Sequence, residues 1–178
     1  MKKNSILKAF GILPLALFIL PAFAQSQAGD NINFDKKAII ASAKAAPDAA
    51  SMEDLKTMSK KAFENFSKNF KGATDIHISN KNKEIFVYFQ QDGIANRVGY
   101  DKKGNWHHRI RYYGEAQLPA DVRKIVKSTF YDYNIFGVTE VTVGNKTAHL
   151  VNIEDKTTWK TVKVVDGEME VMHEYTKG

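Results

Sequence analysis

The side chains best suited to chemistry in this 178-residue sequence are its five histidines. His107 and His108 are adjacent in a segment that alternates like a β-strand, so their rings would point to opposite faces and could not chelate one metal ion. The other histidines lie in separate segments, and no carboxylate stands at a familiar ligand spacing such as HExxH. We therefore expect no metal site and no cofactor, and interpret the histidines as solvated or half-buried strand residues.

A nucleophilic centre is not indicated either. The sequence contains no cysteine, which excludes thiol catalysis, cysteine-based zinc sites and disulfides. It has no GxSxG turn and no phosphate-binding loop. Acidic pairs such as Glu168 and Glu170 flank or line expected hairpins, where solvated charges are the ordinary case. The residues thus predict a protein that is not an enzyme.

A candidate binding face lies on the expected strands of the first half. In segment 84–91, alternation assigns Ile85, Val87 and Phe89 to the core. The side chains expected on the opposite, open face mix aromatic and cationic groups: Phe86, Tyr88, Arg97, His107, Arg109, Arg111 and Tyr113. Tyrosine and arginine are enriched at interfaces, and the cations suit an acidic or carboxylate-bearing partner.

Two alternatives to this binding face stay open. The face could be the ordinary polar side of a one-sided sheet. A bulge could also slip the parity of one strand and exchange its two sets of side chains. The second half would place on the matching surface His149, Val151, Val162, Val164 and Met172, whereas parity does not assign Trp159 to either face.

The N-terminus predicts export. Three lysines precede an apolar run at 9–20, and Ala22-Phe23-Ala24 is a cleavage signal, so residues 1–24 are expected to be a signal peptide. The run is short for a membrane span, which makes an N-terminal membrane helix the less favoured alternative. We expect a periplasmic or secreted protein with no permanent membrane anchor after cleavage. Half of the net charge of +6 belongs to this segment, so nucleic-acid binding is not expected.

The remaining sequence predicts a leader at 25–50 and an ordered region at 51–178. A helix capped by Ser51 runs to Phe70 with an apolar stripe, and a second begins at Pro119. Strands are expected after each helix, at 74–79, 84–91, 94–101 and 106–113, and again at 139–143, 147–154, 157–165 and 168–175. Because Asp101, Gly104 and Tyr112 recur as Asp166, Gly167 and Tyr175, we predict an α+β fold: a tandem repeat, about 51–113 and 118–178, of a helix followed by a four-stranded antiparallel sheet, with the helices on one sheet face.

Several ordered motifs carry a family resemblance. They are Tyr100-Asp101-Lys102-Lys103-Gly104-Asn105-Trp106, then Leu118-Pro119-Ala120-Asp121-Val122, then Tyr133-Asn134-Ile135 leading into Val138-Thr139-Glu140-Val141. In order and spacing, the chain resembles the PepSY-like proteins that share the fold of the β-lactamase inhibitor protein, over roughly 51–175. The resemblance implies an exported, non-catalytic module. Together with the candidate face, it predicts a protein or peptide partner in the cell envelope, held on the open sheet face; the alternative is an inhibitor of a secreted or periplasmic hydrolase.

Overall fold

The computed structural model describes residues 52–178, so the predicted signal peptide and leader lie outside the described residues. The described part begins with two α-helices, α2 (Met52–Met58) and α3 (Lys60–Asn69), where the sequence pattern predicted one. Ser59 separates them: its backbone is extended, and its hydroxyl accepts a hydrogen bond of 3.2 Å from the Ala62 amide. This N-cap starts a new helix within the predicted one. In the part of the chain described, no helix has the length and hydrophobicity needed to cross a membrane.

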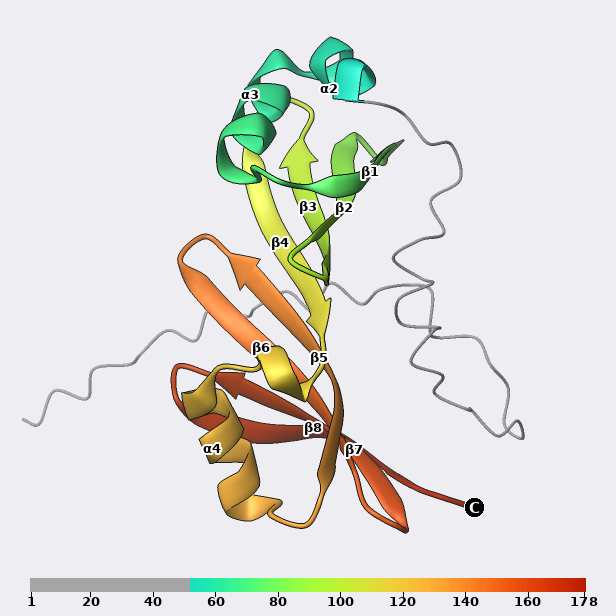
Figure 1. The fold of residues 1–178 in the computed structure, drawn as a ribbon, viewed down its shortest axis with the longest axis vertical. Helices are drawn as coiled ribbons and strands as arrows, with labels where there is room; N and C mark the ends of the chain where they lie inside the picture. The colour runs from blue at the N-terminus through green and yellow to red at the C-terminus, as the bar shows by residue number, and fades with distance from the viewer. Residues whose placement is uncertain (1–51) are drawn as a thin grey trace, which may run out of the picture. The chain divides into compact units, whose positions relative to one another are not determined.

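Eight strands form one antiparallel sheet in which each strand pairs with the next along the chain (Figure 1). The strands are β1 (Thr74–Lys81), β2 (Glu84–Gln91), β3 (Ile94–Asp101), β4 (Trp106–Tyr113), β5 (Asn134–Val143), β6 (Lys146–Glu154), β7 (Thr158–Val165) and β8 (Glu168–Thr176). Between β4 and β5 the chain forms a short 3-10 helix, η1 (Glu115–Gln117), and the α-helix α4 (Ala120–Thr129).

The prediction of a tandem repeat, each copy having its own four-stranded sheet, is wrong. Strand β4 pairs with β5 along six residue pairs, from His108↔Val143 to Tyr113↔Val138. The pairing satisfies backbone groups that two separate sheets would leave unpaired at their facing edges. The molecule is α+β, as predicted, but residues 52–178 form three α-helices and one continuous sheet.

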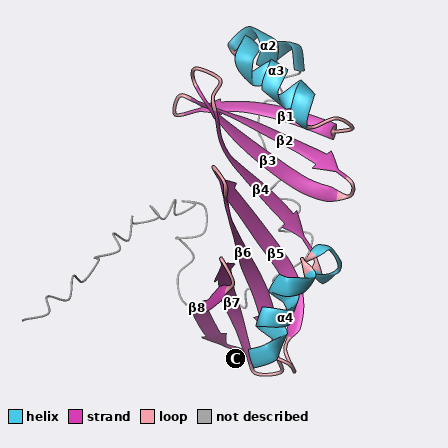
Figure 2. Cartoon of the chain, turned by 90° about the vertical axis from the view of Figure 1, so that its left-hand side faces the viewer, coloured by secondary structure: helices cyan, strands magenta, loops and turns pink. Residues whose placement is uncertain are grey.

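The core consists of two clusters on one side of this sheet. Helices α2 and α3 cover β1–β3, where Leu55, Phe66 and Val87 are at most 2 % exposed. Helix α4 covers β5–β8 (Figure 2), where Val126 and Val162 are fully buried. Strand β4 contributes to both clusters, because its first residue packs on one and its last on the other. We call this side of the sheet the helix side and the opposite side the open face.

A β-bulge near the start of β4 decides which of its side chains reach the open face. Gly99 pairs with His108, but the next residue of β3, Tyr100, pairs with Trp106, so His107 is the extra residue. The bulge lets Trp106 pack into the first core cluster while His108 lies on the open face. Regular alternation would have put Trp106 and His108 on the same side.

Candidate binding face

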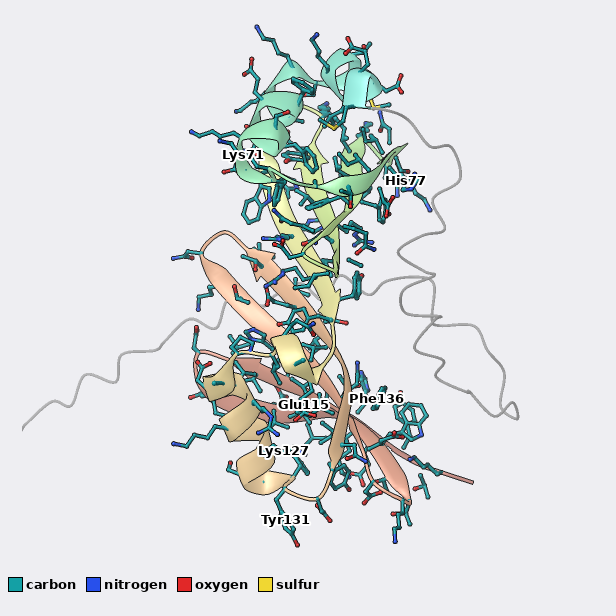
Figure 3. The ribbon with its side chains drawn as sticks, in the orientation of Figure 1. Lys71, His77, Glu115, Lys127, Tyr131 and Phe136 are labelled. Carbon is teal, nitrogen blue, oxygen red and sulfur yellow. The ribbon has the colours of Figure 1, made fainter. Side chains whose placement is uncertain are left out.

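Three of the predicted binding residues lie together on the open face. Phe86 pairs with Gly99, and Tyr88 pairs with Arg97, both across β2 and β3. These side chains have the parity opposite to that of the buried Val87, which packs under the helices. Figure 3 shows His77, the partner of Tyr88 on β1, on the side of the sheet away from Lys71.

Three other predicted residues lie on the helix side. Arg109 pairs with the buried Val98, and Tyr113 pairs with Val138 of the second core cluster; Arg111 lies between them with the same parity. The seventh, His107, is the exposed bulge residue, and its Nδ1 lies 3.7 Å from a carboxylate oxygen of Glu84. The seven residues therefore do not form one surface.

The bulge explains this difference from the sequence prediction. The prediction of regular alternation along 106–113 put Arg109, Arg111 and Tyr113 on the open face, and this assignment is wrong because the bulge shifts the parity after His107. The open face instead receives His108, Ile110 and Tyr112, which the sequence reasoning missed. Gly99 lies beside this bulge. A glycine inside a strand often marks a bulge or a close approach, so Gly99 could have indicated the bulge from the sequence.

The surface expected from the second half also differs. Val151, Val162 and Val164 are at most 2 % exposed and belong to the second core cluster, and His149 shares their parity. Met172 lies at a register irregularity between β7 and β8. The open-face side chains of this half are those of the alternate parity, which include Ala148, Leu150, Lys163 and Val165. Trp159 pairs with Tyr175, and their rings stack at 4.4 Å.

Arg97 lies at the centre of the open face of the first half. Its cross-strand neighbours are Tyr88 and Ile110. The next residues on the same face lie two positions along each of the three strands. They are Phe86, Gly99 and His108 in one direction and Gln90, Ala95 and Tyr112 in the other. The residues beside Arg97 on its own strand are small, whereas the adjoining strands carry rings. A single cation is thus framed by aromatic side chains from two strands.

Direct contacts fix this arrangement. The guanidinium carbon of Arg97 lies 5.3 Å from the centre of the Phe86 ring, a cation–π distance. The Phe86 ring centre lies 6.1 Å from that of His108. The His108 ring occupies the space above Gly99, where a Cβ would come within 2.3 Å of Cε1. Burial lowers the pKa of His108, and the charge of Arg97 lowers it further, so this imidazole is mainly neutral at neutral pH.

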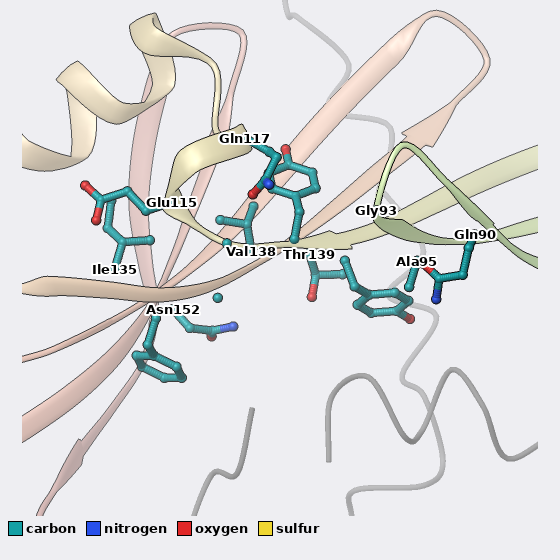
Figure 4. Close-up of a pocket in the computed structure, with 14 residues that line it drawn as sticks. Gln90, Gly93, Ala95, Glu115, Gln117, Ile135, Val138, Thr139 and Asn152 are labelled. Carbon is teal, nitrogen blue, oxygen red and sulfur yellow. The ribbon is translucent and has the colours of Figure 1, made fainter. Parts of the chain in front are cut away.

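A cleft of about 420 Å³ lies beyond the end of β4, lined by open-face residues such as Tyr112 and Thr139 and by helix-side residues such as Tyr113 and Val138. Figure 4 shows Gln90 and Ala95 at one end and Glu115 and Ile135 at the other. The cleft arises because β5 extends beyond the last β4 partner, so η1 and the β2–β3 turn flank the start of β5, which pairs with β6 but has no strand on its other edge. Tyr112 belongs both to the surroundings of Arg97 and to this lining, which makes the two regions continuous.

The polar residues of the helix side are engaged with each other. Arg109 donates to Oδ1 of Asn96 from Nε at 3.0 Å and from Nη2 at 2.7 Å. Arg111 Nη1 lies 3.1 Å from both carboxylate oxygens of Glu140, and the Tyr113 hydroxyl donates to Oε2 at 2.6 Å. These contacts join β3 to β4 and β4 to β5, in the stretch between the two core clusters.

Glu140 is buried and remains charged. Burial alone would raise its pKa, but His149, Tyr113 and Arg111 stabilise the carboxylate and lower the pKa to about 2. Across residues 52–178, no group of three or more His, Asp or Glu side chains is placed to hold a metal ion.

Comparisons with known proteins bear on the fold. No family model and no curated protein matches the chain. A BLIP-like protein from Bacteroides fragilis NCTC 9343 superposes with a TM-score of 0.53 and 18% identity, over 75% of this chain and 89% of that one. A DUF2874 family protein from Bacteroides uniformis ATCC 8492 gives a TM-score of 0.51 and 13% identity, over 65% of this chain and 87% of that one. A proposed periplasmic protein from Bacteroides eggerthii DSM 20697 superposes with a TM-score of 0.51 and 16% identity, over 65% of this chain and 86% of that one. The chain therefore has a BLIP-like fold, and the PepSY part of the resemblance stays a prediction.

Proposed function

We propose that this protein is a non-catalytic binding module of the periplasm that holds a protein or peptide partner on its open face. The observation that carries the proposal is the continuity of that face: the aromatic surroundings of Arg97 run through Tyr112 into the cleft beside β5. The described helices pack on the other side of the sheet. An extended face with rings, a cation and a recess suits a macromolecular partner.

Residue chemistry supports a protein or peptide as the occupant. Tyrosine, tryptophan and arginine supply most of the binding energy at protein interfaces, because each buries a large area with few rotatable bonds or several donors. The open face presents Tyr88, Arg97 and Tyr112 near its centre, and the Trp159–Tyr175 stack near the β8 edge. The positive charge at the centre favours a partner that is acidic where it meets Arg97.

The location is supported by two independent lines. The N-terminal pattern of lysines, apolar run and small residues is typical of an export signal. The structures of similar fold include a BLIP-like protein and a proposed periplasmic protein. Because fold alone does not fix function, the partner must be tested directly.

Site-specific photocrosslinking in the cell envelope tests the face itself. A benzoyl-phenylalanine at Val143, which is 49% exposed and pairs with His108 on the open face, should form a discrete adduct. The same group at Lys124, exposed on α4, should not. Added wild-type protein should suppress the Val143 adduct, whereas a Tyr112→Ala competitor should suppress it poorly. Adducts at Lys124 alone, or equal suppression by both competitors, would contradict the proposal.

A second candidate function is inhibition of a secreted or periplasmic hydrolase. The similarity to a BLIP-like structure favours it, and it would use the same face. Purified protein assayed against a panel of secreted hydrolases, including β-lactamases and proteases, would show stoichiometric inhibition that Tyr112→Ala weakens. If no hydrolase is inhibited while the crosslink at Val143 persists, the partner is bound without being inhibited.

A further inference from the structure

The arginines of the described residues differ in the groups that their guanidinium groups contact. Arg109 is bound by the Asn96 amide, and Arg111 by the Glu140 carboxylate. Arg123, on α4, forms an ion pair of 2.7 Å with Glu115. Within residues 52–178, Arg97 has neither an ion pair nor a hydrogen bond; its contact is the face of the Phe86 ring.

The Nε of Arg97 is buried and has no hydrogen-bond acceptor among the described residues. A donor left in this state destabilises the fold, because it has lost water and gained no acceptor in return. Fixed, partly desolvated donors bind an incoming anion more strongly than donors in water, since the desolvation has already occurred. The Nε of Arg111 is buried in the same way, but the guanidinium of Arg111 is already paired with Glu140. In Arg97, which has no such pair, the buried Nε points to an acceptor supplied by a ligand.

His108 presents a second atom of the same kind. Its Nε2 is also buried without a partner among the described residues. The ring is held in place by the absence of a side chain at Gly99 beneath it and by Phe86 beside it. A neutral imidazole whose proton is on Nε2 can donate one hydrogen bond. Arg97 and His108 together form a donor pair on one face of adjacent strands.

We propose that Arg97 and His108 bind the carboxylate of an aspartate or glutamate side chain on the partner. This inference rests on the proposed function and names the chemistry at the centre of the same face. The planar guanidinium matches a carboxylate with two parallel N–H···O bonds, and His108 would donate to one of the two oxygens.

Charge and geometry favour a carboxylate side chain. One unpaired cation balances one negative charge, whereas a phosphate dianion would call for another cation. The open-face lysines of β6 and β7 are already paired, Lys146 with Asp166 at 3.2 Å and Lys163 with Glu170 at 2.6 Å. The rings on the adjoining strands flank Arg97 within the sheet, so a partner would reach the guanidinium perpendicular to the sheet. A side chain on a strand or loop of the partner projects in this direction. The same rings would exclude water from the ion pair and strengthen it.

Selection of peptides tests the inference without knowledge of the partner. A displayed library of random linear peptides would be selected in parallel on the wild-type protein, Arg97→Gln, Arg97→Lys and Lys124→Gln. Lys124 is an exposed cation on α4, so its replacement is a charge-matched control on the other side of the sheet. Peptides selected on the wild type and on Lys124→Gln should be enriched several-fold in Asp or Glu next to apolar residues. Arg97→Gln should still select apolar peptides, but their acid content should fall to that of the library, and Arg97→Lys should show a reduced enrichment.

The outcomes separate the two proposals. Selection of apolar peptides without acids on the wild type, or equal acid enrichment on Arg97→Gln, would overturn the carboxylate site and leave the binding face standing. Recovery of no peptide from any variant would count against both. For a selected peptide, replacement of its acid by the matching amide should weaken binding to the wild type by at least about 10-fold, the usual strength of a charge-assisted pair.

A measurement on the wild-type protein removes any concern about variant folding. In an NMR titration with the selected acidic peptide, the Nε–Hε signal of Arg97 should shift, and it should remain unchanged with the amide version of the same peptide. A shift confined to the signals of Arg109 or Arg111 would refute the site, because these side chains lie on the helix side.

Discussion

The roles of individual residues here depend on which face their strand presents. Arg109 and Arg97 lie on adjacent strands, yet one is bound to Asn96 within the fold and the other faces outward beside Phe86. The types of residue that form the candidate site could be predicted from the sequence, as could the placement of Tyr88 and Arg97 on one face. The inclusion of His108 could not, because it depends on a bulge that alternation does not reveal.

The contact between Gly99 and His108 gives a prediction at this scale. Gly99→Ala would place a Cβ 2.3 Å from Cε1 of His108, so the ring must move off the strand. We expect a loss in the free energy of unfolding of about 1–3 kcal/mol, typical of overpacking. The same substitution made in a His108→Ala background should cost much less, because the clashing ring is gone. Urea unfolding of the four proteins measures this coupling; equal costs in both backgrounds would show that the ring does not rest on Gly99.

At the scale of elements, the strands were predictable and their connections were less so. The bounds predicted for β2, β3 and β4 agree with the structure, because alternation and turn residues define them locally. The break between α2 and α3 was missed, although Ser59 is a good N-cap residue, because the apolar stripe continues through it. The pairing of β4 with β5 was also missed, since strand pairing across an intervening helix leaves no local pattern.

The turn between β3 and β4 docks on the start of α3, which gives a second prediction. Gly104 has a positive φ of 78°, and a Cβ there would lie 2.2 Å from Oγ of Ser59 and 2.8 Å from the backbone nitrogen of Ala62. Gly104→Ala should therefore lower the free energy of unfolding by about 2–4 kcal/mol, from backbone strain and overpacking together. Gly93→Ala is the matched control, because it has a similar φ of 72° but open space around it. Thermal unfolding that is equal for the two variants would contradict the docking.

The buried carboxylate of Glu140, which links β5 to β4, predicts that the stability of the fold depends on pH. The pKa of Glu140 in the fold, about 2, lies below its ordinary value of 4.5, so the charged form stabilises the fold above pH 4.5. This contribution, on the order of 3 kcal/mol, should be lost as the pH falls from 4.5 towards 2. Glu140→Gln should remove it, so the stability difference from wild type should shrink across this window in urea unfolding. Glu64→Gln, on the exposed side of α3, is the control for the removal of one carboxylate.

At the scale of the whole molecule, one sheet joins two core clusters. Among the described residues, β4 supplies Trp106 to the first cluster and Tyr113 to the second, and the Arg111–Glu140 pair lies between them. The sequence could predict an α+β fold with helices and strands in this order, but its near-repeat of motifs indicated two sheets. The repeat describes local patterns, whereas the single sheet depends on long-range pairing.

The continuous sheet predicts cooperative unfolding of the ordered region. The two tryptophans of the chain lie in different halves, Trp106 at the first cluster and Trp159 on β7. In Trp106→Phe and Trp159→Phe, the remaining tryptophan reports one half at a time. Fluorescence and circular dichroism should give one coincident transition in each variant. A midpoint from Trp159 that differs from that of the backbone signal would show that the halves unfold separately.

The central claim, that the partner binds the open face around Arg97, is tested most directly by two arginines on adjacent strands. The affinity of a selected acidic peptide would be measured calorimetrically for wild type, Arg97→Gln and Arg109→Gln, each checked to be folded. We predict that Arg97→Gln weakens binding by at least about 10-fold, whereas Arg109→Gln lowers stability through the loss of its Asn96 contacts but leaves affinity unchanged. Weakened binding in Arg109→Gln with unchanged binding in Arg97→Gln would contradict the account and place the partner on the helix side.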